Sequence, residues 1–393
     1  MKSVCYRCEE DYAGHRARCE CGEPLWYVPD AANYEPRSAP GMWRHADLLP
    51  LEEPAGIGAA AGGTPLVRSE RLDDVAGCRV FVKDEAENPT GSYKDRGSAI
   101  AVAHAVERGH DAIGTVSYGN MAMSTAANAA SVDLDCLVLV PTDTSPVRLA
   151  LIAQYDPTVF QVAGDYGALY DEVVGFNDSP VAFYLSDPPT RIAGYATCIH
   201  EIVDQSDSIP DGIVLPTSSG GFASGVYRGL LDCQRAGLLS DLPSMYLVQT
   251  AESDPITRAF QADESVTPLS PDEVGDTIAR SIGNPAPPSG NRALAGVRET
   301  DGSVVSVSDE ELLAAKRQFA ERAGLCVEPA SSTTLAGVQR LTERGELAAD
   351  DTVVLVPTGT GFKEMDTDVA PGDAETVERA ALRDRLAAVL AAH

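Results

Sequence analysis

The sequence predicts an α/β protein whose parallel sheets carry helices on both faces. From about residue 78, short apolar runs alternate with segments of helical periodicity, a pattern typical of parallel strands joined by helices. The chain has 393 residues, 44% of them hydrophobic, which is enough for two core-sized domains. We find no run of 18 or more apolar residues and expect no transmembrane helix. The first residues contain no apolar signal-peptide core, which favours a cytoplasmic location.

The expected elements follow one another along the chain. Apolar runs predict strands over residues 79–83, 112–117, 135–140, 181–185, 212–216, 245–249 and 353–356. Helical spacing predicts helices over residues 94–108, 121–130, 195–203 and 222–236, and another from Pro146. Ser308 and Glu311 have the spacing of a capping box, which predicts a helix that runs to Ala323. Ligands of such folds bind at the carboxyl ends of the strands.

The charge balance limits the possible partners. Fifty-nine acidic and 30 basic residues give a formal charge of −29, and the acidic residues are spread along the whole chain. Such a surface repels phosphates and argues against nucleic acid. A cationic partner or adaptation to high salt would explain the charge, and the even spread favours high salt. Only five of the basic residues are lysines, so each lysine is a candidate for a specific role.

The nine cysteines fall into two groups. Five are scattered in apolar surroundings, where we expect small buried side chains: Cys78, Cys136, Cys198, Cys233 and Cys326. Four form the pattern Cys-x2-Cys-x10-Cys-x-Cys: Cys5, Cys8, Cys19 and Cys21. Four thiolates can close a tetrahedral zinc site, and a ribbon without metal is the alternative. We therefore predict a four-cysteine, zinc-ribbon-like module over residues 1–28, followed by a Pro-, Gly- and Ala-rich linking segment over residues 29–63.

Lys94 stands at the start of a predicted helix, after the turn residues Asn88-Pro89-Thr90-Gly91. The positive end of the helix dipole lowers the pKa of a lysine in this place and frees its amine as a nucleophile. The alternative is a solvated lysine in the charged sequence Lys-Asp-Arg.

Three more polar motifs follow predicted strands. Thr217-Ser218-Ser219-Gly220-Gly221 would let backbone amides approach a phosphate, although plain β–α turns are also rich in glycine. Asn120, in Ser117-Tyr118-Gly119-Asn120, would bind a ligand oxygen or cap a helix. Thr358, in Pro357-Thr358-Gly359-Thr360-Gly361, would present a hydroxyl to a ring nitrogen or belong to a simple turn.

These four motifs, in this order, resemble the fold-type II enzymes that use pyridoxal phosphate, and threonine synthases most of all. The similarity runs from Gly63 to about Glu364. It implies two open parallel-sheet three-layer subdomains within residues 64–393, the smaller over about 95–205. Asp95 after the lysine, the segment Thr277–Pro285 and Thr-Gly-x-Gly-Phe-Lys near the end are similar to the synthases rather than to the amino-acid dehydratases.

The resemblance also implies roles for single residues. Lys94 would form the Schiff base with the cofactor and shuttle protons. Asn120 would bind the 3-hydroxyl group of the cofactor, and Thr358 would face the pyridine nitrogen. The phosphate of the cofactor would be held by Ser218, Ser219, Gly220 and Gly221. Ser117 and Arg191 would bind substrate, with Arg191 on its phosphate. The implied reaction is the conversion of O-phospho-L-homoserine and water to L-threonine and phosphate by a homodimer.

Three positions depart from the family pattern. Met121 replaces a threonine that helps to bind substrate, Ala196 replaces a lysine, and Asp187 aligns near an asparagine and would repel a phosphate. Two alternatives therefore stay open. One is a related lyase or β-replacement enzyme, such as a serine/threonine dehydratase or a cysteate synthase. The other is a non-catalytic paralogue that binds a ligand or a partner.

Overall fold

The computed structural model describes residues 2–14, 16–164, 169, 172–173, 181–183, 187–363 and 375–391. The chain divides into two units, Met1–Phe362 and Lys363–His393. The second unit contains helix α12 (Leu382–Ala391). The first unit contains all the predicted site residues.

The larger sheet has six strands in the order β12-β11-β10-β13-β5-β4. Its strands are β4 (Leu66–Arg68), β5 (Arg79–Lys83), β10 (Gly212–Pro216), β11 (Ser244–Thr250), β12 (Ser303–Val307) and β13 (Thr352–Leu355). All neighbours pair in parallel except β4, which runs antiparallel to β5. The parallel strands place their carboxyl ends at one edge of the sheet.

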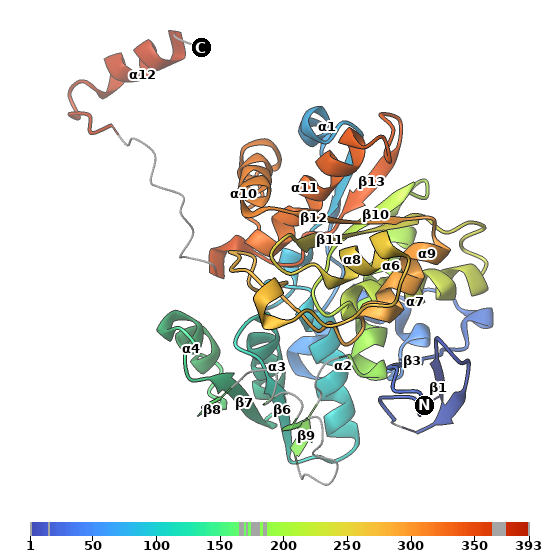
Figure 1. Ribbon diagram of the computed structural model, residues 1–393. Coiled ribbons are helices and arrows are strands. Elements are labelled where there is room, and N and C mark those ends of the chain that lie inside the picture. The colour runs from blue at the N-terminus through green and yellow to red at the C-terminus, as the bar shows by residue number, and fades with distance from the viewer. Residues whose placement is uncertain are drawn as a thin grey trace. The chain divides into compact units, whose positions relative to one another are not determined.

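The smaller sheet is fully parallel, with the order β8-β7-β6-β9. Its strands are β6 (Ala112–Val116), β7 (Asp135–Pro141), β8 (Thr158–Val162) and β9 (Val181–Phe183). In Figure 1 this sheet lies with α3 and α4 below the larger sheet. The predicted class, α/β with parallel sheets, is confirmed.

The α-helices connect these strands. Their bounds are α1 (Glu70–Ala76), α2 (Lys94–Glu107), α3 (Asn120–Ala130), α4 (Pro146–Ala153), α6 (Pro189–Gln205), α7 (Gly221–Arg235), α8 (Pro255–Ala262), α9 (Gly290–Glu299), α10 (Asp309–Gln318) and α11 (Pro329–Glu343). A π-helical turn, η6 (Phe319–Ala323), extends α10. Short 3-10 helices are η4 (Glu85–Glu87), η5 (Pro271–Glu273) and η7 (Gly361–Lys363).

Alternate residues of the larger sheet enter two separate cores. On β10, Ile213 and Leu215 pack with α6, α7, α8 and α9, whereas Val214 packs with α1, α10 and α11. This period of two follows from the strand geometry, because successive side chains point to opposite faces. The two faces are thus covered by different sets of helices, as the sequence predicted.

The N-terminal part has little regular structure beyond a small sheet. Strands β1 (Lys2–Cys5), β2 (Asp11–Ala13) and β3 (Leu25–Tyr27) form an antiparallel sheet in the order β2-β1-β3. Residues 29–63 contain three 3-10 helices: η1 (Ala31–Asn33), η2 (Gly41–Leu48) and η3 (Gly56–Ala60). Met42 and Trp43 of this segment pack against Ile100 of α2, so it lies on the body of the molecule.

The sequence located most central elements correctly. Strands β5 and β10 have the expected bounds, and the Ser308–Glu311 capping box is present. Helix α6 begins at Pro189, six residues before the predicted start at residue 195, because Pro at the first helical position is favourable. Residues 184–185 of the strand expected at 181–185 lie outside the described residues. The sequence missed β4, β8, β12, α1, α8, α9 and α11, although α11 is among the most buried helices. The expectation that Cys326 is buried was wrong, because this cysteine is exposed.

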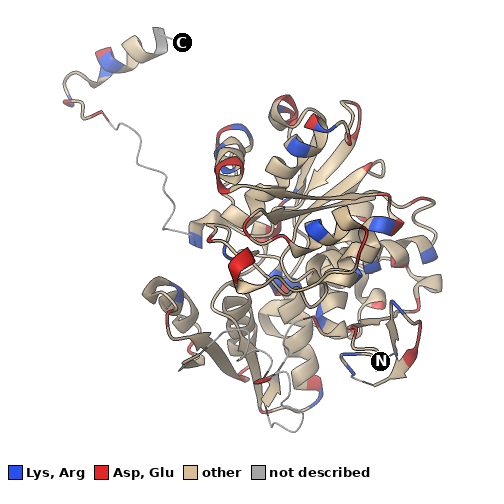
Figure 2. Cartoon of the chain, viewed as in Figure 1, with Lys and Arg blue, Asp and Glu red and all other residues tan. Residues whose placement is uncertain are grey.

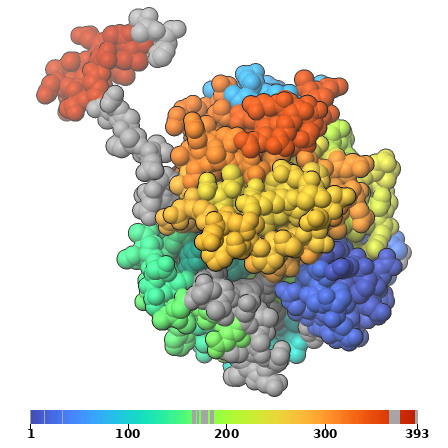
Figure 3. Space-filling model, in the orientation of Figure 1, coloured from blue at the N-terminus to red at the C-terminus, as the bar shows by residue number. Residues whose placement is uncertain are grey.

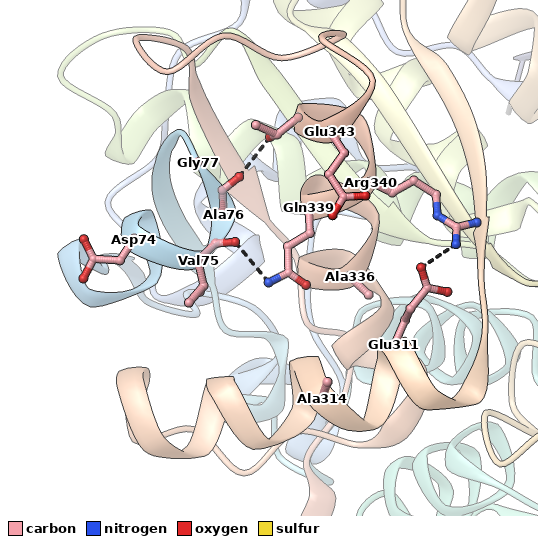
Figure 4. A pocket seen from close by; sticks show the side chains of 11 residues that line it. Asp74, Val75, Ala76, Gly77, Glu311, Ala314, Ala336, Gln339, Arg340 and Glu343 are labelled. Atoms are coloured by element: carbon pink, nitrogen blue, oxygen red, sulfur yellow. Dashed lines mark hydrogen bonds and ion pairs between the residues drawn. The ribbon is translucent and has the colours of Figure 1, made fainter.

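Two surface features have no part in the predicted site. Acidic residues are scattered along the chain in Figure 2 rather than gathered in one segment. A cavity of about 420 Å³ lies between α1, α10 and α11, where the Glu311–Arg340 ion pair and a hydrogen bond from Gln339 to the Val75 carbonyl cross its wall (Figure 4). The α11 residues that line this cavity, Ala336 to Glu343, belong to the C-terminal half of the helix. The cavity is therefore away from the predicted site residue Thr358, which contacts Ser331 in the first turn of α11. Within the described residues, no helix is long and apolar enough to cross a membrane.

Candidate active site

Lys94 is the first residue of α2 and is half-buried, with its amine over the rings of Tyr93 and Tyr195. Its Nζ donates to the Tyr93 hydroxyl at 2.6 Å and lies 5.7 Å from the centre of the Tyr195 ring. The pKa of Lys94 is lowered from its ordinary value of 10.5 to about 8, and burial is the largest cause. The positive charge of Arg191 also contributes to this lowering, whereas the Asp187 and Glu328 carboxylates oppose it. The amine is therefore much easier to deprotonate than that of a surface lysine.

The loop before Lys94 is tied to the loop that contains Thr358. The Tyr93 amide donates to the Thr358 carbonyl at 3.0 Å, and the Thr360 amide donates to the Gly91 carbonyl at 3.0 Å. On the other side, the Asp95 carboxylate accepts a hydrogen bond of 2.6 Å from the Thr90 amide. The loop is fixed from both sides, and this brings Lys94 next to the end of β13.

A buried ionic network involves Arg96, in the first turn of α2. Arg96 is completely buried and pairs with Glu85 and Glu201, each at 2.7 Å. Lys83 pairs with Glu201 at 2.7 Å and donates to the Thr64 carbonyl at 2.6 Å. Each charge has an opposite partner, which offsets the cost of removing it from water. The network joins β5, α2 and α6 and so sets the position of the helix that begins with Lys94.

Glycines let α6 come close to α2. A Cβ atom on Gly194 would lie 2.3 Å from the Arg96 carbonyl oxygen, and one on Gly97 would lie 2.5 Å from Arg191 Cγ. Such distances leave no room for a side chain at either position. The close crossing puts Arg191 of α6 near Lys94, so two residues that are 97 positions apart share one site.

Arg191 is fully buried, yet its guanidinium is only partly bonded. One terminal nitrogen contacts the Met121 sulfur, whereas Nε and the other terminal nitrogen have no hydrogen-bond partner in the described part of the chain. A buried guanidinium whose nitrogens lack partners is stabilised when an anion binds to it. Met121, at the start of α3, lies directly against this predicted anion-binding residue.

Glu328 connects two predicted site residues, and sequence reasoning missed it. Its carboxylate accepts a hydrogen bond of 2.8 Å from the Asn120 side-chain amide and one of 3.4 Å from the Thr358 hydroxyl. Thr358 also lies 3.1 Å from the Ser331 hydroxyl. Glu328 is only 4% exposed and immediately precedes Pro329 at the start of α11. The combination of an acid and Pro at a helix start is the signal that would have drawn attention to it.

The loop Thr217–Gly221 follows β10 and leads into α7. Gly220 has a φ of +82°, and a Cβ atom there would lie 2.6 Å from the Ser289 carbonyl oxygen. On Gly221 a Cβ atom would lie 1.9 Å from an Asp187 carboxylate oxygen. Gly220 therefore has to be glycine, because its φ is positive and its neighbour is backbone. A side chain at position 221 would displace the Asp187 carboxylate. An anionic group, the Asp187 carboxylate, already lies against the helix N-terminus, where an anion is favoured.

The remaining predicted residues lie in two places. The Ser117 amide donates to the Leu139 carbonyl at 3.1 Å, and its hydroxyl accepts from the Gly119 amide at 3.3 Å, so Ser117 shapes the turn that leads to Asn120. The four ribbon cysteines are separate from this site. Their sulfurs all lie within 4.8 Å of one another, with three separations of 3.7, 3.4 and 4.0 Å. A tetrahedral site with Zn–S bonds of about 2.3 Å has S–S edges of about 3.8 Å, so the geometry fits zinc.

The residues around Lys94 fit pyridoxal phosphate by their chemistry. A readily deprotonated amine is available to the aldehyde of the cofactor. The glycine-lined start of α7 would accept an anion of the kind that its phosphate provides. The Thr358 hydroxyl and the Asn120 amide, which now bond to Ser331 and Glu328, would offer neutral partners to ring atoms.

Comparisons with known proteins agree with this fit. Residues 57–359 match the family model described as pyridoxal-phosphate dependent enzyme. A threonine synthase of Methanocaldococcus jannaschii is 31% identical over 93% of this chain and 94% of its own length. One of Methanosarcina acetivorans is 34% identical over 84% of this chain and 81% of its own.

A solved structure shares the fold at lower identity. The L-serine ammonia-lyase of the fungus Rhizomucor miehei matches with a TM-score of 0.66 and 23% identity, over 78% of this chain and 95% of that one. This likeness concerns the fold, whereas the family match and the two synthases concern the chemistry. The chain belongs to the family of pyridoxal-phosphate dependent enzymes and is a lyase with the fold-type II architecture.

Proposed function

We propose that the protein is a threonine synthase, which converts O-phospho-L-homoserine and water to L-threonine and phosphate. The observation that carries this proposal is Arg191, a buried guanidinium with two unpartnered nitrogens among the described residues. A phosphate on the substrate would supply the missing acceptors in the bidentate arrangement that arginine prefers. The similarity to synthases at 31–34% identity supports the same substrate.

Each residue near Lys94 has a proposed part in this reaction. Bound pyridoxal phosphate supplies an aldehyde that links to amines and a ring that draws electrons from the neighbouring carbon atoms. We propose that the Lys94 amine would hold the cofactor and, once the substrate amine has taken its place, would move protons at the α and β carbons of the substrate. Asn120 and Thr358 orient the ring, Ser218 to Gly221 hold the phosphate of the cofactor, and Ser117 contacts the substrate.

Two departures from the family pattern bear on this proposal. Met121 contacts Arg191 and offers a thioether in place of a hydroxyl, so substrate contacts there must differ. Ala196 of α6 is 2% exposed, and its methyl group offers neither a charge nor a hydrogen bond to a phosphate. The substrate phosphate would therefore depend more heavily on Arg191 than in enzymes that have both cations.

The deciding experiment compares four substrates with the same enzyme preparation: phosphohomoserine, phosphoserine, threonine and serine. We expect threonine and phosphate from phosphohomoserine. Arg191→Met should lower kcat/KM for the phosphorylated substrate by about 10- to 100-fold, the loss expected when hydrogen bonds to a charged group are removed. Arg44→Met, which alters an exposed arginine, is the matched control. If phosphohomoserine gives no threonine, the proposal is wrong.

A second candidate is a serine/threonine dehydratase or a β-replacement enzyme such as a cysteate synthase. The observation that favours it is Met121, which occupies one side of the Arg191 guanidinium. In this case ammonia release from threonine or serine, or exchange of their β-substituent, would exceed turnover of phosphohomoserine. Arg191→Met would then affect phosphorylated and unphosphorylated substrates equally.

Further proposals concern the rest of the chain. We propose that Cys5, Cys8, Cys19 and Cys21 bind a structural zinc ion, which metal analysis of the purified protein will test. We also propose a cytoplasmic homodimer adapted to high salt. A monomer by light scattering in about 2–3 M salt, where surface charges are fully screened, or lower stability there than at low salt, would contradict this. The proposed division into residues 1–28, 29–63 and 64–393, with the smaller subdomain over about 95–205, can be tested by limited proteolysis.

A further inference from the structure

Arg292 is a buried cation that the reaction itself does not use. It lies on α9 and is fully buried. Its two terminal nitrogens donate to the Leu25 carbonyl at 2.8 Å and to the Ser289 hydroxyl at 3.0 Å, while Nε has no partner in the described part of the chain. No carboxylate forms an ion pair with it among the described residues. Burial lowers its pKa to about 10, which still leaves it charged at neutral pH.

On one side, Arg292 bonds to Ser289, a residue that packs against the proposed phosphate loop. Its partner Ser289 is tied to this loop, because the Ser289 amide donates to the Ser219 carbonyl at 2.9 Å. The Ser289 carbonyl lies so close to Gly220 that a Cβ atom there would be 2.6 Å away. The Ser289 hydroxyl also donates to Asp187 at 2.7 Å. A shift of Ser289 would thus change the shape of the loop directly.

On the other side, Arg292 holds the N-terminal ribbon. Leu25 lies on β3, directly opposite Cys5 of β1. The Arg292 guanidinium also lies 5.6 Å from the centre of the Trp26 ring, and this ring packs at 5.8 Å on Tyr227 of α7. The ribbon therefore contacts α9 and α7, the helices whose first residues border the loop. Figure 3 shows the blue N-terminal segment packed against the body of the molecule.

We propose that Arg292 is a positioning residue which makes the four-cysteine ribbon part of the cofactor-phosphate site. It bridges the β3 strand, next to Cys5, and Ser289, which precedes α9 and borders the phosphate loop. Loss of the guanidinium or of the order of the ribbon weakens retention of the phosphate end of the cofactor. The inference depends on the proposed binding of that phosphate at Ser218–Gly221, and it is independent of the identity of the substrate.

The test measures cofactor binding and not turnover. Arg292→Met removes the charge and both hydrogen bonds, and Arg298→Met is the matched control. Arg298 lies on the same helix and donates to the Glu264 carbonyl at 3.0 Å, but is exposed. Dissociation constants are determined for pyridoxal phosphate and for pyridoxal, which lacks the phosphate. We expect Arg292→Met to lower the affinity for pyridoxal phosphate about tenfold or more and the affinity for pyridoxal by less than about threefold. Arg298→Met should bind both compounds about as tightly as the unmodified protein.

A second variant covers the case in which Arg292→Met does not fold. Cys5→Ser disturbs the ribbon opposite Leu25 and leaves Arg292 in place. It should lower the affinity for pyridoxal phosphate more than the affinity for pyridoxal, while the helix signal in circular dichroism is unchanged. The proposal would be overturned if the folded variants lose affinity for both compounds equally, or if they bind both as tightly as the unmodified protein. Absence of turnover of phosphohomoserine by the unmodified, cofactor-loaded protein would count against the proposed reaction instead, and would leave this proposal about cofactor binding unaffected.

Discussion

The nucleophilicity of Lys94 is the property most directly open to experiment, with pH as the perturbation. Burial among aromatic rings is the main cause of the fall of its pKa to about 8. At pH 7 a lysine with this pKa is neutral in about 9% of molecules, against about 0.03% for an ordinary lysine. The difference is about 300-fold in the concentration of reactive amine. Below pH 8 the amine is mostly protonated, so its reactivity should fall tenfold for each further pH unit.

The assay follows covalent attachment of pyridoxal phosphate to cofactor-free protein, with borohydride trapping and peptide mapping. The initial rate at Lys94 should rise with pH and level off with a midpoint near 8. Lys2, whose side chain is 60% exposed, reports the effective reagent concentration in the same sample. Arg191→Met should move the midpoint upward and Asp187→Asn should move it downward, because their charges have opposite effects on the ammonium form. A midpoint near 10, or equal shifts in one direction, would refute the reasoning.

Three substitutions test the contacts that position Lys94 and its neighbours. Glu201→Gln leaves the buried Lys83 without a counter-charge, although Arg96 keeps Glu85, and should cost about 3–5 kcal/mol in the free energy of unfolding by denaturant. Asp204→Asn, in an exposed pair with Arg44, should cost less than about 1 kcal/mol. Gly194→Ala places a methyl group 2.3 Å from the Arg96 carbonyl oxygen of α2. Enzyme activity should therefore fall, with little change in helix content by circular dichroism. Unchanged activity would show that the contact between α2 and α6 tolerates the methyl group. Glu328→Ala removes the carboxylate that accepts hydrogen bonds from the Thr358 hydroxyl and the Asn120 side-chain amide. Titration with pyridoxal phosphate should then show an affinity about tenfold lower. An unchanged affinity would argue against a role for Glu328.

The sequence alone determined the local features of this protein. The alternation of apolar runs and helical segments was sufficient for the parallel α/β class, because strand and helix periodicities are properties of neighbouring residues. The same holds for the glycine loop at residues 217–221 and for the cysteine spacing. Lys94 was recognised because its turn and helix start are contiguous in the chain.

Only the tertiary structure decided which distant groups meet. Arg191 comes close to Lys94 because Gly97 and Gly194 let two helices cross without side chains between them. Glu328 joins Asn120 to Thr358 across 208 and 30 positions of the chain, respectively. Arg292 reaches Leu25 over 267 positions. Such contacts depend on helix crossings and loop pairings, which no local periodicity encodes, and the depressed pKa of Lys94 depends on the burial that they create.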